Sequence, residues 1–77
     1  MTYGNIGKYI DSKTGKPVCD LLRNPNTNAY AIRDYVKMTI KEYKTFKRAC
    51  RESQILACRW TALTGNKTTY INIVKER

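Results

Sequence analysis

The clearest chemical feature of the chain is a set of basic residues in its middle third. Apolar residues across positions 29–52 recur at the spacing of an amphipathic helix, with basic residues beside them and acids on the other flank. The basic members are Arg33, Lys37, Lys41, Lys44, Lys47, Arg48 and Arg51. Positive groups along one exposed edge attract polyanions, so the sequence predicts a cationic binding surface on this helix.

These like charges act against helix stability. Arg33, Lys37 and Lys41 follow one another at intervals of four residues, and each such pair costs roughly 0.2–0.5 kcal/mol. Arg48 and Glu52 form a favourable pair that relieves only part of this repulsion. An anionic partner would offset the cost, and the plainer alternative is a solvated helix face that keeps the protein soluble.

The sequence offers little for catalysis. It has no histidine, and no two carboxylates stand at a spacing that demands a shared site. We therefore expect a protein that is not an enzyme and that takes no cofactor or small-molecule substrate. Asp20, set between Cys19 and Leu21, is the acid most worth locating. A metal-dependent nuclease built from two distant carboxylates is the disfavoured alternative.

The three cysteines do not form a metal-binding pattern. Cys19, Cys50 and Cys58 lack both histidine neighbours and the two-residue spacing of a zinc knuckle. An odd number of widely spaced cysteines favours free thiols in a reducing compartment, which places the protein in the cytoplasm. We expect these side chains to be buried as small hydrophobic groups.

Length and charge define the class of protein. The chain has 77 residues, with 15 Lys and Arg against 6 Asp and Glu, giving a formal net charge of +9. This length predicts a single compact domain over residues 1–77. The sequence contains neither a secretory signal nor an apolar run of the roughly 18 residues that cross a membrane. Nucleic acid or an acidic protein is therefore the expected partner.

A hairpin is expected before the basic segment. Residues 3–11 and 17–23 favour strands, and Gly15 lies in the polar stretch between them. Residues 24–28 then break the chain before the predicted helix. Residues 38–47 also suit a strand, and this alternative stays open.

A second hairpin is expected after the helix. Residues 55–62 and 68–75 alternate in polarity and are joined by the turn-forming residues 64–67. The prediction is a small α+β fold in the order hairpin, helix, hairpin. Its antiparallel sheet has about four strands, and the long helix packs on one face.

The other face of this sheet is a second candidate surface. If Trp60, Ile71 and Ile73 point toward the helix as core residues, alternation leaves a different set on the open face. That set is Tyr9, Arg59, Tyr70 and Asn72. The tyrosines could stack on unpaired bases while the arginine meets the backbone. Ordinary packing or a homodimer contact is the alternative.

Two functions follow from these observations. The favoured one is a small basic module that docks on nucleic acid or a nucleoprotein through the cationic helix flank. The other is a protein-binding inhibitor or accessory factor of the phage type, which occupies an acidic or nucleic-acid-binding surface of a host complex. Charge and size suit both, and no motif separates them.

Overall fold

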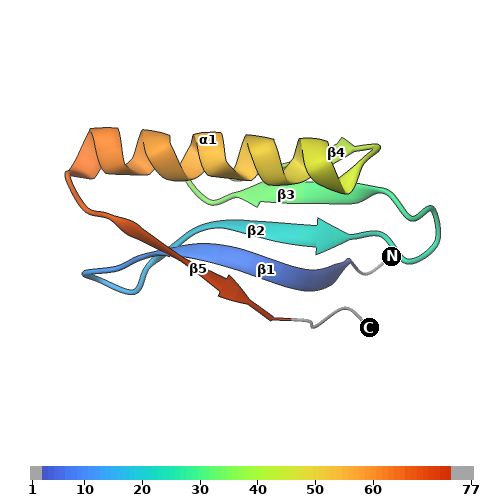
Figure 1. Cartoon of the computed structure of the whole chain (residues 1–77), viewed down its shortest axis with the longest axis horizontal. Coiled ribbons are helices and arrows are strands. Elements are labelled where there is room, and N and C mark those ends of the chain that lie inside the picture. Colours follow the sequence, from blue (N-terminus) through green and yellow to red (C-terminus); the bar gives the residue numbers. More distant parts are fainter. Residues whose placement is uncertain (1–2, 74–77) are drawn as a thin grey trace.

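The fold is a five-stranded antiparallel sheet with one helix (Figure 1), seen in a computed structural model that describes residues 3–73. The elements are β1 (Gly4–Asp11), β2 (Pro17–Arg23), β3 (Tyr30–Asp34), β4 (Thr39–Tyr43), α1 (Phe46–Thr64) and β5 (Thr68–Asn72). The strands lie in the order β4-β3-β2-β1-β5, so β4 and β5 form the two edges. The α+β class is confirmed, with five strands where about four were expected.

The first hairpin is confirmed. β1 pairs antiparallel with β2, and Gly15 takes a φ of 76° in the connecting turn, a left-handed conformation that glycine adopts without steric cost. β5 returns to the other side of β1 and pairs Tyr70 with Tyr9. The second predicted hairpin is therefore wrong, because the strand from residue 68 has β1 as its partner. Positions 74 and 75 of that predicted strand lie outside the described residues.

The position of the predicted helix is also wrong. Residues 30–43 form the β3–β4 hairpin, so the strand alternative for 38–47 was correct for β4. The turn is built by Asp34, whose Oδ1 accepts hydrogen bonds from the backbone amides of Val36 (2.9 Å) and Lys37 (3.2 Å). Met38 follows with a φ of 57°. This aspartate turn and the left-handed residue reverse the chain where a helix would have continued.

The helix begins later, at a cap that the sequence contains. Thr45 has extended backbone and its hydroxyl accepts a hydrogen bond from the amide of Arg48 at 3.2 Å. At the other end Gly65, with a φ of 78°, donates its amide to the carbonyl of Thr61 at 2.8 Å. Residues 55–62, expected as a strand, lie inside this helix.

The core lies between α1 and the centre of the sheet. Leu21 from β2 and Ile32 from β3 pack with Cys19 and Ala49, and all four side chains are buried. The buried positions of α1 are small, namely Ala49, Ser53 and Ala57. Small residues at every fourth position let the helix approach the sheet closely. α1 packs mainly on β2 and β3 and contacts β4 and β5 less.

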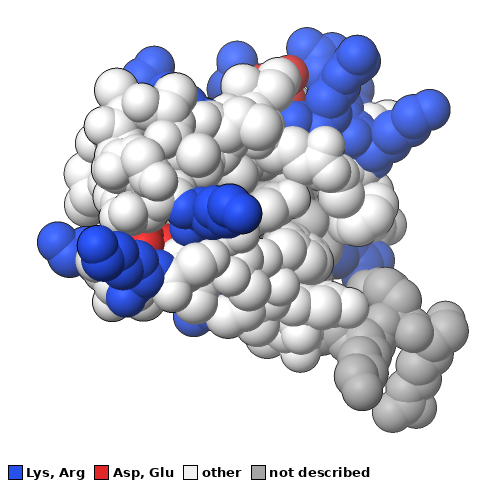
Figure 2. Space-filling model, turned by 60° about the vertical axis from the view of Figure 1, so that its left-hand side comes forward, with Lys and Arg blue, Asp and Glu red and all other residues white. Residues whose placement is uncertain are grey.

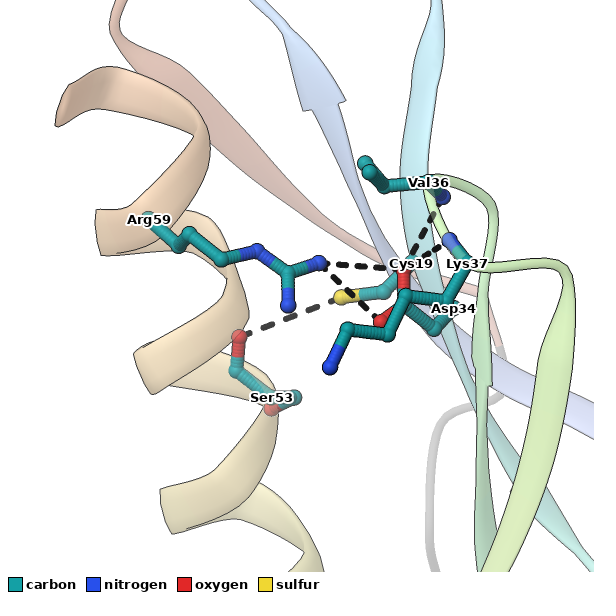
Figure 3. Close-up of polar contacts among 6 residues, drawn as sticks. All are labelled: Cys19, Asp34, Val36, Lys37, Ser53 and Arg59. Carbon is teal, nitrogen blue, oxygen red and sulfur yellow. Dashed lines mark hydrogen bonds and ion pairs between the residues drawn. The ribbon is translucent and has the colours of Figure 1, made fainter. Parts of the chain in front are cut away.

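A part-buried ion pair joins the helix to β3 (Figure 3). Arg59 Nη2 donates to both carboxylate oxygens of Asp34, at 3.0 and 3.2 Å. Burial alone would raise the pKa of Asp34, but the hydrogen bonds from Arg59 and the two turn amides lower it. One carboxylate therefore builds the β3–β4 turn and anchors the C-terminal half of α1.

A second buried carboxylate, Asp11 at the end of β1, contacts Trp60, the helix residue next to Arg59. Asp11 Oδ1 accepts the amides of Lys13 (2.7 Å) and Thr14 (3.0 Å). Its Oδ2 accepts Trp60 Nε1 (2.8 Å) and Asn66 Nδ2 (3.0 Å). The β1–β2 turn, α1 and the turn before β5 thus meet at one side chain. Trp60, expected on a strand in the core, is a half-buried helix residue that uses its indole N–H here.

The sheet face away from α1 is less open than expected. Val18, Leu22 and Ala31 point to this side and are nevertheless buried. Tyr3, which precedes β1, donates its hydroxyl to Glu42 Oε2 on β4 at 2.6 Å. The Tyr3 side chain therefore reaches across this face to β4.

The Arg59–Asp34 pair should contribute measurably to stability. Arg59→Ala leaves a buried carboxylate without its cation, and we expect the free energy of unfolding to fall by about 1.5–3 kcal/mol. Arg48→Ala is the matched control, because the Arg48–Glu52 pair is more exposed and longer, at 3.8 Å. It should cost only about 0.2–0.5 kcal/mol. Equal losses in urea unfolding would contradict the role assigned to Arg59.

Acid should destabilise the fold through Asp11. Although burial acts in the opposite direction, hydrogen bonds from Asn66, Thr14, Trp60 and Lys13 hold the pKa of Asp11 well below the unfolded value of 3.8. The stability it supplies is complete above about pH 4 and is lost as the pH falls toward the folded pKa. The difference in unfolding free energy between the wild type and Asp11→Asn should therefore narrow below about pH 4. Parallel pH profiles would contradict this.

Candidate nucleic-acid interface

The aspartates of the described chain all face inward. Asp11, Asp20 and Asp34 are only 1%, 2% and 6% exposed. Asp20, the acid singled out from the sequence, accepts a hydrogen bond from the Tyr35 hydroxyl at 2.5 Å and lies 3.5 Å from Arg33. It lies on the sheet face opposite α1. Because these negative groups are inside, the outer surface is more cationic than the composition alone indicates.

Five basic residues gather where β4 meets the first turns of α1. This set, which we term the cationic edge, comprises Lys41, Lys44, Lys47, Arg48 and Arg51, all of them exposed. Figure 2 shows blue side chains concentrated at the upper right, over this end of the molecule. Glu52 contacts Arg48, and Lys41 Nζ lies 5.7 Å from the centre of the Tyr43 ring.

Two of the seven basic residues predicted for the surface lie elsewhere. Arg33 is on β3, where its side chain meets Asp20 on the face away from α1. Lys37 is exposed in the β3–β4 turn, at the opposite end of the hairpin from Lys44. The helix predicted to carry all seven is therefore wrong. The other five lie on or just after the edge strand β4 and in the first turns of α1.

The start of α1 adds to the positive potential. Its first turn contains no acid and carries Lys47 and Arg48. The N-terminal end of a helix already has a partial positive charge, so these cations lower helix stability by roughly 0.3–1 kcal/mol each. A bound anion would relieve that repulsion.

The second predicted surface is only partly assembled, and on the opposite face from the one expected. Tyr9 and Tyr70 are cross-strand neighbours with ring centroids 5.0 Å apart, and Asn72 shares their face by alternation. They lie on the side of α1, since Tyr9 packs against the core cluster. Arg59 is not with them, because it is part of α1 and bonds to Asp34.

A groove of about 420 Å³ separates α1 from β1 and β5. Its walls are Tyr9, Gln54, Ala57, Cys58, Thr61 and Thr68. The sequence-based prediction missed the α1 wall because it placed residues 55–62 in a strand. Thr45 and Gly65 were the signals that place this helix, since they are typical capping residues at its two ends.

The side chain of Tyr70 packs against Gly7. Gly7 is buried beside it, and a Cβ built at Gly7 would overlap the Tyr70 hydroxyl. The ring therefore lies over the backbone of β1 beside Tyr9, which lines the groove, and 43% of the residue stays exposed. Burial, and then the nearby Cys50, raise the pKa of Tyr70, so this tyrosine is neutral at physiological pH.

No protein-family model, curated protein or solved structure matches this chain, so its function must be inferred from its own geometry. Within residues 3–73, no group of three or more metal-ligating side chains gathers. In the same part of the chain, no helix is both long and apolar enough to cross a membrane.

The three thiols differ in their surroundings. Cys19 is buried, and its Sγ donates to the carbonyl of Ser53 at 3.8 Å (Figure 3). Cys50 is half-buried, whereas Cys58 is exposed and lines the groove. The expectation of burial is therefore correct for Cys19 and wrong for Cys58. Burial, with Asp20 and Asp34 nearby, raises the pKa of Cys19 to about 12.

Alkylation should distinguish these cysteines in the native protein. At pH 8 a thiol with a pKa near 12 has roughly 1000-fold less thiolate than one at the ordinary 9.0, so Cys19 should react only after unfolding. Cys58 should react first with iodoacetamide, as followed by peptide mass spectrometry. Native Cys19 that reacts as fast as Cys58 would show that the packing of β2 against α1 is wrong.

Proposed function

We propose that this protein is a non-enzymatic binding module that docks on nucleic acid, alone or within a nucleoprotein, through the cationic edge. The observation that carries the proposal is that acidic and basic residues differ in burial. The aspartates are buried, whereas the five basic residues at the start of α1 and along β4 are exposed. Phosphate backbones supply the regular negative charge that such a surface attracts.

The cationic edge differs in geometry from a basic helix that lies in a nucleic-acid groove. Lys41 belongs to an edge strand and Lys44 to the connection that follows it, while the other three cations project from the first turns of α1. Contacts of this kind hold phosphates and do not read base edges. Binding should therefore depend strongly on salt and little on sequence.

Salt titration tests this directly. If all five cations meet phosphates, log affinity against log salt should have a slope of about −3.5 on single strands and about −4.5 on duplex, from roughly −0.7 and −0.9 per contact. The double variant Lys41→Glu/Lys44→Glu should reduce the magnitude of that slope by about 2. Fluorescence anisotropy with labelled oligonucleotides measures both.

The control has the same change in charge at a distant place. Lys13→Glu/Lys16→Glu alters the β1–β2 turn, at the other end of the molecule, and should leave the slope nearly unchanged. Equal effects of the two double variants would show that net charge, and not the cationic edge, drives binding. A flat salt response would contradict the proposal altogether.

A second candidate function rests on the tip of the β3–β4 hairpin. Val36, Met38 and Ile40 are large apolar residues that stay exposed there, Met38 by 79%, beside Lys37. Apolar side chains with an adjacent cation suit a protein partner with an acidic rim. This supports the inhibitor or accessory-factor alternative. Affinity purification of the wild type and Met38→Glu, with and without nuclease, separates the two functions, since a protein partner captured through the tip survives nuclease and depends on Met38.

The three cysteines of this chain are free, which suits a reducing compartment. We therefore infer that the protein acts in the cytoplasm, where nucleic acid and nucleoprotein are abundant.

A further inference from the structure

We propose that the groove between α1 and the β1–β5 strands holds a single strand of nucleic acid, with an unpaired base stacked on Tyr70. This rests on the proposed function and names its preferred substrate. Tyr70 and Tyr9 provide aromatic surface, and basic residues of the cationic edge continue one wall. Single strands are held in this way, by stacking on aromatic rings beside a cationic path for the backbone.

The α1 wall links the groove to the cationic edge. Gln54 and Cys58 line the groove. Lys47 and Arg51 precede them on the same flank, because positions 47, 51, 54 and 58 follow one another at three- and four-residue steps. A strand lying along this flank would pass from the two cations onto the uncharged groove without leaving the helix.

Nothing acidic lines the groove. Its walls are aromatic, small apolar, amide or hydroxyl side chains, and none is charged. Figure 2 shows a mostly white surface below the blue group at the upper right, with other blue side chains at the centre and left and red beside those at the left. Lys67, exposed immediately before β5, adds a cation at the end of the groove near Thr68. A polyanion therefore meets attraction at both ends and no repulsion between them.

The position of the Tyr70 ring suits stacking with an unpaired base. Its ring lies over Gly7, where any larger residue would displace it, and it packs at an interplanar angle of 57° to Tyr9. The neighbouring ring and the glycine fix its orientation while much of the residue stays in solvent. The groove has the volume of a small-ligand pocket, which suits a base or two and is too small for a double helix.

The test compares Tyr70→Leu with Tyr70→Phe, using labelled 15-residue oligothymidylate and a duplex of the same length. The wild type should bind the single strand more tightly than the duplex. Tyr70→Leu should weaken single-strand binding roughly 5- to 150-fold, the range expected for one lost base–aromatic stack. Tyr70→Phe should retain it. Tyr3→Leu is the matched control, since this tyrosine bonds to Glu42 away from the groove.

The outcomes separate this inference from the proposed function. Tight binding that ignores Tyr70 and favours neither form of nucleic acid would overturn the groove and leave the cationic edge intact. Absence of binding to both oligonucleotides would overturn both. A loss caused equally by Tyr70→Leu and Tyr70→Phe would assign the effect to the hydroxyl and exclude stacking.

A second measurement uses the unaltered protein, so it does not depend on the folding of a variant. Cys58 lines the groove and is exposed. Saturating oligothymidylate should slow alkylation of Cys58 at least several-fold, as resolved by peptide mass spectrometry. An unchanged rate at saturation would show that the strand lies elsewhere and would overturn the inference.

Discussion

The bond between Arg59 and Asp34 is the constraint on which the rest of this structure depends. Asp34 ends β3, and its carboxylate orders the turn into β4 while it accepts hydrogen bonds from Arg59 in the C-terminal half of α1. Burying this carboxylate is tolerable because it is fully hydrogen-bonded and paired. The pair joins the turn of the hairpin to the C-terminal half of α1, while residues 44 and 45 alone connect β4 to the start of the helix.

The burial of the other aspartates explains why the surface is cationic. Asp11 ties three segments together and Asp20 is bonded on the opposite sheet face, so neither is left to neutralise outward lysines and arginines. A net charge that the sequence spreads along the chain becomes an exposed cationic edge at one end of the molecule. The edge strand β4 carries lysine, which also discourages pairing with a second sheet.

Much of the fold class could be predicted from the sequence, whereas the order of elements could not. Gly15 and the strand-forming residues on either side specify the first hairpin. Between residues 29 and 52 the apolar positions fit a helical period, yet Tyr30, Ile32 and Asp34 also alternate, and a short apolar run is ambiguous between the two. Asp34 forms an Asx turn that reverses the chain into β4, and its carboxylate also bonds to Arg59, a contact 25 residues away that local patterns do not contain. The sequence predicts the five cations of the cationic edge as binding residues, but their arrangement depends on where β4 ends and α1 begins.

The most direct test of where a polyanion binds is an NMR titration of the ¹⁵N-labelled protein with oligothymidylate. Amide shifts should move at residues 41–58 and around Tyr70, whereas Leu22 and Ala31, buried under the opposite face, should stay in place. Shifts confined to that opposite face or to the β1–β2 turn, or no shifts at saturating oligonucleotide, would contradict the central claim that the cationic edge and its adjoining groove form the binding surface.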